Sequence, residues 1–177
     1  MSFAAYEPGA GRKPSVDVII REPFASELAE CAALVVSRAG GDVDVRRERL
    51  ARDLAKDDYY MLVAVVGAEI VGFAQVMHFV AQPDPPSDIA PDGYYLIALI
   101  VASDWRRRGI GDDLTYARIA WVAERADEVF YFANAGNGAI LDLHGRLGFA
   151  EVSRQFTFPG VTFTGGEGVL LKRSIRP

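Results

Sequence analysis

Two hydrophobic periods alternate along the chain and predict strands and helices in turn. Short runs rich in β-branched and aromatic residues indicate strands, whereas apolar residues spaced three and four apart indicate helices that bury one face. The predicted strands are residues 16–21, 59–66, 69–80, 94–101, 129–133, 151–158 and 169–175. The predicted helices are residues 26–40, 45–56 and 109–126, and a short helix between Asn137 and Gly148.

Turn-forming residues separate these segments. Gly67 and Ala68 form a two-residue turn between the second and third strands, which predicts a hairpin. The proline-rich stretch 82–88 is incompatible with a central strand and predicts a loop. The helix at 109–126 is long enough to connect two parallel strands, whose ends can splay and leave a cleft.

Composition indicates a single domain of ordinary size. The chain has 177 residues, half of them apolar, which suffices for one well-packed core. Residues 1–14 lack periodicity and predict a flexible tail before a single domain at 15–177. The net charge of −5 argues against general binding to nucleic acid or anionic membranes and permits a cationic amine substrate. No apolar run reaches membrane-spanning length and no leader begins the chain, so a cytoplasmic location is expected.

The single cysteine and the two histidines do not indicate a disulfide or a metal site. Cys31 is the only cysteine and lies on an apolar helical face, which predicts a buried thiol without a disulfide. The two histidines and this cysteine are far apart in sequence, so no metal site is expected.

A basic, glycine-containing stretch follows the strand at 94–101 and opens a helical pattern. It reads Arg106, Arg107, Arg108, Gly109, Ile110 and Gly111. Backbone N–H groups at a helix start can surround an anion, and the helix dipole favours its charge. The glycines let a ligand approach the backbone, and the arginines would add forked phosphate donors. The stretch predicts a pyrophosphate cradle, with a solvated strand-to-helix connection as the simpler alternative.

The motifs around this cradle resemble those of the GNAT superfamily of acyl-CoA-dependent N-acyltransferases. In the family's motif A, Arg or Gln is followed after two residues by Gly and then, after one more, by Gly or Ala. Arg106, Gly109 and Gly111 fill these places. In motif B an Asn precedes a short helix and a Gly-Phe pair, and Asn137 and the pair at 148–149 align with it.

The resemblance extends in element order over residues 16–175, with the motifs concentrated between 96 and 149. It implies an α/β fold with a mixed, mostly antiparallel central sheet of about six to seven strands and helices on both faces. It further implies transfer of an acetyl group from acetyl-CoA to a primary amine of a small molecule or peptide, by direct attack in a ternary complex. Such folds commonly form dimers, and the residues leave a homodimer open. A non-catalytic acyl-CoA sensor and a protein that binds another nucleotide are the alternative interpretations.

The resemblance also assigns individual residues. Those expected to bind acetyl-CoA are Ile100, Val101, Arg106, Arg107, Arg108, Gly109, Ile110, Gly111, Asn137 and His144. The backbone of Ile100 and Val101 would pair with the pantetheine amides, and the N–H of Val101 would stabilise charge on the thioester oxygen. Tyr95 stands where many members place a catalytic glutamate. A phenol with an ordinary pKa of about 10 is a poor base, so ordered water or another acid, such as Asp92, would take the amine proton.

His144 occupies the place of the motif B tyrosine, which in this family commonly protonates the departing thiolate. It shares a helix face with Asn137, Ile140 and Leu147. Neutral imidazole, with an ordinary pKa of about 6.5, keeps one N–H to donate. Two interpretations stay open: His144 donates a proton to the thiolate, or it packs at the helix end and forms local hydrogen bonds.

The acceptor amine is not specified by these residues. Acidic side chains that would suit a cationic amine are Glu27, Glu30, Asp42, Asp44, Asp84, Asp88 and Asp92. The tyrosines at 59, 60, 94 and 95 would equally suit an aromatic amine. Solvated surface acids are the simpler interpretation of the carboxylates, and His78 is expected to be a packed strand residue.

Overall fold

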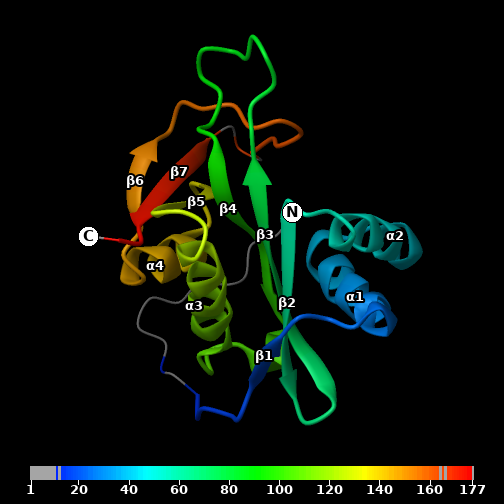
Figure 1. The fold of residues 1–177 in the computed structure, drawn as a ribbon. Helices are drawn as coiled ribbons and strands as arrows, with labels where there is room; N and C mark the ends of the chain where they lie inside the picture. Colours follow the sequence, from blue (N-terminus) through cyan, green and yellow to red (C-terminus); the bar gives the residue numbers. More distant parts are fainter. Residues whose placement is uncertain (1–10, 12, 164, 166, 177) are drawn as a thin grey trace. The chain divides into compact units, whose positions relative to one another are not determined.

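The computed structural model describes residues 11, 13–163, 165 and 167–176, so most of the predicted tail at 1–14 lies outside the described residues. Strands and helices follow one another along this part of the chain (Figure 1). The strands are β1 (Ile19–Arg21), β2 (Tyr59–Val66), β3 (Glu69–Phe79), β4 (Gly93–Val101), β5 (Glu128–Asn134), β6 (Ala150–Ser153) and β7 (Gly168–Ser174). The α-helices are α1 (Leu28–Ala39), α2 (Val43–Leu54), α3 (Ile110–Ala123) and α4 (Gly138–Arg146), and the 3₁₀ helices are η1 (Ala25–Glu27) and η2 (Ser103–Trp105).

The strands have the order β1-β2-β3-β4-β5-β7-β6. The pairs β1–β2, β2–β3, β5–β7 and β6–β7 are antiparallel. The hairpin predicted at Gly67 is present, with Tyr59 opposite Met77 and Val66 opposite Glu69. The expected α/β class with a mostly antiparallel sheet is confirmed.

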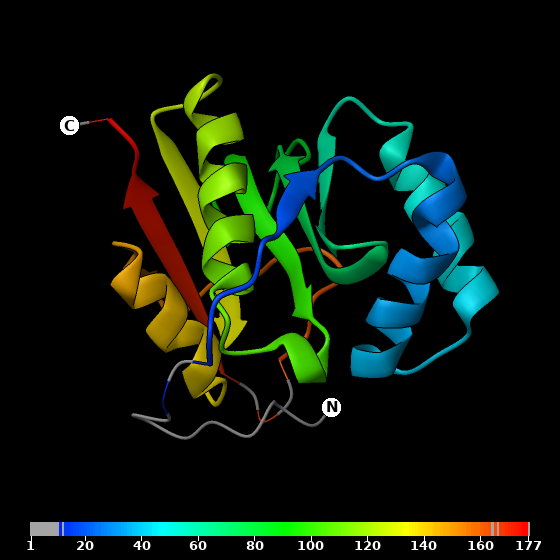
Figure 2. The same cartoon turned by 90° about the horizontal axis from the view of Figure 1, so that it is seen from below.

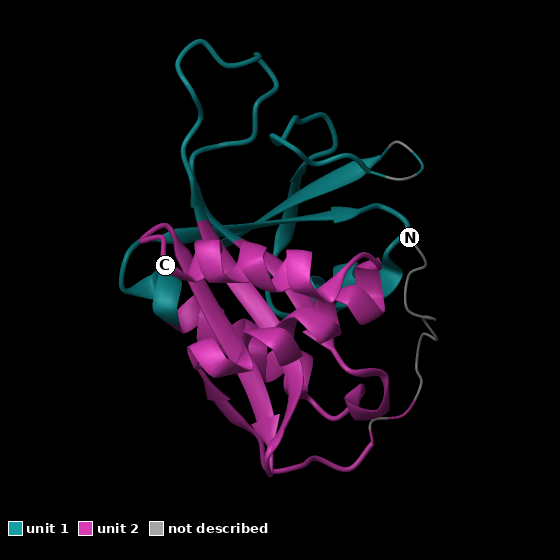
Figure 3. Cartoon of the chain, turned by 90° about the vertical axis from the view of Figure 1, so that its right-hand side faces the viewer, with its two compact units in different colours: residues 1–10, 78–95, 121–177 teal, residues 11–77, 96–120 magenta. Residues whose placement is uncertain are grey.

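The chain is divided into two compact units (Figure 3). Beyond residue 10, unit 1 comprises His78–Tyr95 and Trp121–Pro177, and unit 2 comprises Gly11–Met77 and Leu96–Ala120. The chain crosses from one unit to the other within β3, β4 and α3. The first three residues of β4 therefore belong to unit 1, and its remainder belongs to unit 2.

Helices cover both faces of the strands in unit 2, because side chains of β2 alternate in direction. Met61 and Val63 pack with apolar residues of α1 and α2. Leu62 and Ala64 pack on the other face, with Leu114 of α3. Figure 2 shows α1 and α2 together on one side of these strands and α3 on the other.

The two N-terminal helices have identifiable start and stop signals. Gly40, with φ 71°, ends α1, and the Asp42 carboxylate accepts the N–H of Val45 at 3.0 Å to begin α2. Cys31 on α1 is fully buried, as predicted from its apolar face. Burial raises the pKa of its thiol to about 12. A thiol with so high a pKa is unreactive, which is typical of a structural cysteine.

Unit 1 is built on β5, β7 and β6 and contains a cluster of aromatic rings. Tyr95 lies within it, with its ring stacked on Phe130 at 5.2 Å and edge-on to Phe158 at 5.1 Å. The members are Phe79, Tyr95, Phe130, Phe132, Phe156, Phe158 and Phe163. Aromatic contacts of this kind add to the free energy of burial and fix the rings in position.

The strand predicted at 151–158 is wrong beyond Ser153, where β6 ends. The Ser153 hydroxyl accepts the N–H of Gln155 and donates to its carbonyl oxygen, which forms a local turn. The segment beyond the turn then pairs with the proline-rich loop, through a parallel bridge between Ile89 and Thr157. Phe158 enters the aromatic cluster. Tertiary contacts with a loop distant in sequence therefore override the alternating pattern.

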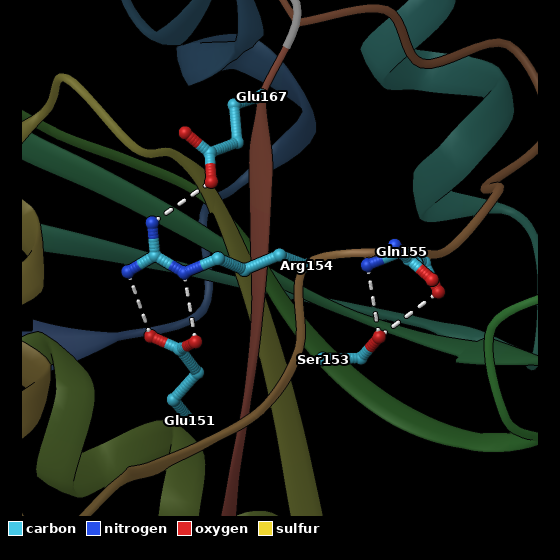
Figure 4. Close-up of polar contacts among 5 residues, drawn as sticks. All are labelled: Glu151, Ser153, Arg154, Gln155 and Glu167. Atoms are coloured by element: carbon cyan, nitrogen blue, oxygen red, sulfur yellow. Dashed lines mark hydrogen bonds and ion pairs between the residues drawn. The ribbon is translucent and has the colours of Figure 1, made fainter.

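Arg154 lies beside this turn and joins the two ends of the β6–β7 connection (Figure 4). Its guanidinium donates to both carboxylate oxygens of Glu151, at 2.8 and 3.0 Å, and to Glu167 at 2.9 Å. These hydrogen bonds raise the pKa of Arg154 further above its ordinary value. The three side chains are about half exposed, so the ion pairs define the path of the connection more than they stabilise the fold.

Within the described residues, no helix combines the length and apolar character required to cross a membrane.

Candidate cofactor-binding site

The loop after β4 is shaped by backbone contacts within unit 2. The N–H of Ala102 donates to Val71 O of β3 at 2.9 Å, which ties down the chain where β4 ends. The Nε–H of Arg106 then donates to Val101 O at 3.0 Å, so the loop folds back on the end of its own strand. The start of α3 is thereby fixed next to the last residues of β4.

Two residues of this loop have positive φ angles, 65° at Arg107 and 93° at Gly109. Left-handed residues in a short loop turn successive N–H groups toward a common centre and create a concave anion site. The outer side of the loop is held by the N-terminal segment. The N–H of Lys13 donates to Arg107 O at 2.9 Å, and Arg108 Nη1 donates to Pro14 O at 3.1 Å.

Helix α3 begins immediately after Gly109, whose carbonyl oxygen accepts the N–H of Asp113 at 3.0 Å. The preceding N–H groups, those of Ile110, Gly111 and Asp112, have no acceptor inside the helix. They project from the positive end of the helix dipole, which favours a bound anion. The helix start and the left-handed loop together form an arrangement of N–H donors that favours a bound anion.

The three arginines of this loop differ in their environments. Arg107 is exposed to solvent. Arg106 and Arg108 are half-buried and donate to Val101 O and Pro14 O, and the Arg108 guanidinium lies 5.6 Å from the centre of the Trp105 ring. Two of the arginines expected as phosphate donors therefore also shape the loop.

Apolar packing holds the loop against the sheet. Leu99, Val101 and Trp105 pack on the core that contains Ile110 and Leu114 of α3. Close packing requires a glycine on β3, because a Cβ at position 72 would lie 3.0 Å from a Leu114 methyl carbon and 3.1 Å from the Ala64 Cβ. The position of the helix start thus depends on the sheet behind it.

Two further features of unit 2 were missed by sequence reasoning. Ala98, inside β4, has a φ of 53°, which interrupts the regular strand before Val101. Arg118 of α3 is fully buried and donates to Ile97 O at 3.2 Å. A signal for Arg118 existed, since it lies on the apolar face of the helix one turn after Leu114. The apolar sequence around Ala98 carried none.

His144 lies in unit 1 and is fully buried. Its ring stacks on Tyr131 of β5, with 3.7 Å between ring centroids, and meets Phe149 edge-on at 5.0 Å. Its Nδ1 is 2.9 Å from Ile140 O. Because a carbonyl oxygen only accepts, Nδ1 carries a proton and donates it to this hydrogen bond. In the neutral ring the other nitrogen, Nε2, then has no proton to donate.

Asn137 and Tyr95 also lie in unit 1. Asn137 precedes α4 as expected, and its carbonyl oxygen accepts the N–H groups of Ile140 and Leu141 at 3.1 Å each. Tyr95 is fully buried in the aromatic cluster, and its hydroxyl donates to Pro91 O at 2.6 Å. Burial raises the pKa of this phenol well above its ordinary value, so it is still less suited to act as a base.

Several acids considered for substrate binding have structural partners. Glu27 pairs with Arg21 at 2.6 Å, and the Asp42 carboxylate caps the N-terminus of α2. Asp88 accepts the Thr157 hydroxyl at 2.7 Å, and Asp92 accepts the N–H of Ala81 at 2.8 Å. The other histidine packs as expected, with the His78 ring centroid 4.5 Å from that of Tyr94.

The predicted site residues thus fall into two groups. The structure brings Ile100, Val101 and residues 106–111 together in unit 2. Tyr95, Asn137 and His144 lie in unit 1.

Comparison with known proteins assigns the chain to a family. Residues 37–166 match the family described as the acetyltransferase (GNAT) domain, and this span is more than half of the chain. The chain therefore belongs to the GNAT acetyltransferase family, as its motifs indicated, and is an acyltransferase. The family uses acyl-CoA, and the donors at the start of α3 fit the diphosphate of such a cofactor. No curated protein sequence matches the chain.

Solved structures share the fold at low sequence identity. Ribosomal-protein-alanine N-acetyltransferase from Brucella melitensis is 22% identical, with a TM-score of 0.68 over 88% of this chain and 99% of that one. NAA60 from Arabidopsis thaliana, in complex with a bisubstrate analogue, is 18% identical, with a TM-score of 0.68 over 89% and 98%. Aminoglycoside 6'-acetyltransferase type Ii is 19% identical, with a TM-score of 0.65 over 90% and 98%.

Proposed function

We propose that this protein transfers an acetyl group from acetyl-CoA to a primary amine by direct attack of the amine in a ternary complex. The observation that carries the proposal is the cradle in unit 2. The left-handed loop at Arg107 and Gly109 leads into the start of α3, directly after the strand that ends at Val101. The N–H groups of Ile110 and Gly111, with the charge of Arg107, would hold the diphosphate.

The bound cofactor supplies a thioester whose carbonyl carbon accepts the amine. In this proposal the backbone of Ile100 and Val101 orients the pantetheine arm. The Val101 N–H donates to the thioester oxygen as negative charge develops there. Water takes the amine proton, because the Tyr95 phenol is buried and donates to Pro91 O. Water also protonates the departing thiolate, because the Nδ1 proton of His144 is donated to Ile140 O.

The acceptor is proposed to be an amine on a small molecule or a peptide. Structures with this fold are named for acceptors of both kinds, a ribosomal-protein alanine and an aminoglycoside. The net charge of −5 favours a cationic acceptor. Glu27, Asp42, Asp88 and Asp92 have the structural partners given above, and Asp44 pairs with Arg47 at 3.3 Å. These contacts do not assign a role to Glu30 or Asp84.

A turnover assay tests this proposal. Release of free thiol from acetyl-CoA is measured with a panel of polyamines, aminoglycosides, aromatic amines and short peptides with free amino termini. At least one amine is expected to accelerate thiol release in the unmodified protein. Gly111→Glu is expected to abolish that release, because its carboxylate occupies the cradle and repels phosphate.

Ala120→Glu is the matched control, since it adds the same carboxylate to an exposed position of the same helix. It is expected to retain turnover. Binding of acetyl-CoA without amine-dependent thiol release across the whole panel would contradict the catalytic proposal and favour an acyl-CoA sensor.

A further inference from the structure

The strand that leads to the cradle contains a strained residue. Ala98 has a φ of 53°, a left-handed conformation that a residue with a side chain adopts at a free-energy cost. It lies within β4, three residues before Val101. Such a conformation persists when surrounding contacts hold it in place. The contacts next to Ala98 therefore hold the end of β4 in its conformation.

A buried arginine holds the backbone immediately before Ala98. Arg118 of α3 is fully buried, and its Nη1 donates to Ile97 O and to Gln75 O of β3, both at 3.2 Å. Its Nε donates to Leu114 O at 3.3 Å. One guanidinium thus connects α3 to two adjacent strands. Removing a guanidinium from water costs free energy, and a long apolar side chain would fill the same space without that cost.

A threonine extends this network to the cradle. The hydroxyl of Thr115, which is fully buried, accepts from Arg118 Nη2 at 3.0 Å and donates to Gly111 O at 2.7 Å. Gly111, Thr115, Arg118 and Ile97 therefore form a continuous chain of hydrogen bonds. All four belong to unit 2. Its two ends are the helix turn expected to bind diphosphate and the strand expected to bind the pantetheine arm.

We propose that Thr115 and Arg118 are positioning residues that set the distance between the diphosphate cradle and the end of β4 beyond Ala98. The inference rests on the proposed function, because only a ligand that spans both features depends on their spacing. The planar guanidinium donates in different directions at once, from Nη1 to the two strand carbonyl oxygens and from Nη2 to the Thr115 hydroxyl. A lysine ammonium or an apolar side chain does not reproduce this arrangement. The pair therefore acts on the fit of the whole cofactor rather than on phosphate binding alone.

The test compares a ligand that reaches only the cradle with one that spans both features. ADP carries the diphosphate, and acetyl-CoA adds the pantetheine arm and the thioester. Thr115→Val removes the hydroxyl and keeps the shape of the side chain, whereas Thr115→Ser keeps the hydroxyl. Calorimetry is expected to show that Thr115→Val weakens acetyl-CoA binding about tenfold and ADP binding less than about twofold. Thr115→Ser is expected to retain the acetyl-CoA affinity within about threefold.

Hydrogen exchange gives a readout that needs no cofactor. In Thr115→Val and in Arg118→Lys, the amides of residues 97–101 are expected to exchange faster than in the unmodified protein, with the amides of β2 unchanged. The inference is overturned if ADP and acetyl-CoA affinities fall in parallel, or if Thr115→Ser and Thr115→Val behave alike. Failure of the unmodified protein to bind acetyl-CoA overturns the proposed function itself, and this inference with it.

Discussion

The environment of His144 favours the interpretation as a packing residue. The ring is fully buried between Tyr131 and Phe149, and its Nδ1 proton is donated to Ile140 O. The neutral ring would therefore offer an acceptor at Nε2, and only the imidazolium could protonate a thiolate. Stacking and a local hydrogen bond are the contacts that the second interpretation, a packing residue, leads one to expect.

His144→Phe tests this role directly. A phenyl ring keeps the stacking on Tyr131, so kcat is expected to stay within about tenfold of the unmodified protein, with the same dependence on pH. If His144 were instead the proton donor, kcat in the unmodified protein would fall as pH rises through the pKa of the imidazolium. That fall would disappear in the variant together with most of the turnover. Steady-state rates between pH 6 and 9 separate the two results.

The Glu27 side chain makes the stability of the fold depend on pH. The pKa of Glu27 is lowered from 4.5 to about 2 by its hydrogen bonds from Arg21, with a further bond from the Phe24 N–H. Because the folded pKa lies below the unfolded value, the carboxylate stabilises the fold fully above pH 4.5 and loses this effect as pH falls toward 2.

Glu27→Gln should remove this dependence. Denaturant unfolding is expected to show the variant less stable than the unmodified protein at pH 6, with the difference shrinking as the pH falls from 4.5 to 2. A difference that is the same at all these pH values would contradict the assignment, since it would reflect packing rather than charge.

The spacing of apolar residues predicted most of the helices and strands. The alternation in β2 and the apolar face of α1 follow directly from the residues, and the buried Cys31 was predicted from that face. The prediction was wrong for 154–158, where alternating phenylalanines enter an aromatic cluster instead of a strand. Periodicity reports which side chains are buried and not which neighbour buries them.

Packing of α3 on the sheet yields a prediction for this element. Gly72→Val would place carbon atoms against the Leu114 methyl group and the Ala64 Cβ, which a Cβ alone already approaches to 3.0 and 3.1 Å. The free energy of unfolding is expected to fall by about 2 kcal/mol. Acetyl-CoA binding is expected to weaken, because the start of α3 must shift.

Gly145→Val is the control, since a Cβ at this exposed helical position meets no atom within 4 Å. It is expected to change the free energy of unfolding by less than about 0.5 kcal/mol. Chemical denaturation measures both variants. Equal effects of the two substitutions would show that the close approach at Gly72 does not position α3.

At the scale of the molecule, the sequence predicted the glycine-containing helix start but not the contacts that shape the loop before it. Gly109 and Gly111 occupy the predicted helix start, whereas the binding of Arg108 to Pro14 joins residues 94 positions apart and has no local signal. The left-handed Ala98 and the buried Arg118 are similarly products of tertiary packing. The motifs thus indicated the acyltransferase family, and the structure added the contacts that hold the parts of unit 2 in place.

Calorimetric titration with acetyl-CoA tests the cofactor site most directly. The unmodified protein is expected to bind one acetyl-CoA per chain, and Gly111→Glu to lose at least about a hundredfold in affinity because its carboxylate fills the cradle and repels phosphate. Ala120→Glu, on the exposed face of the same helix, is expected to bind as the unmodified protein does. Absence of binding to the unmodified protein, or equal binding by Gly111→Glu, would contradict the assignment of the cradle.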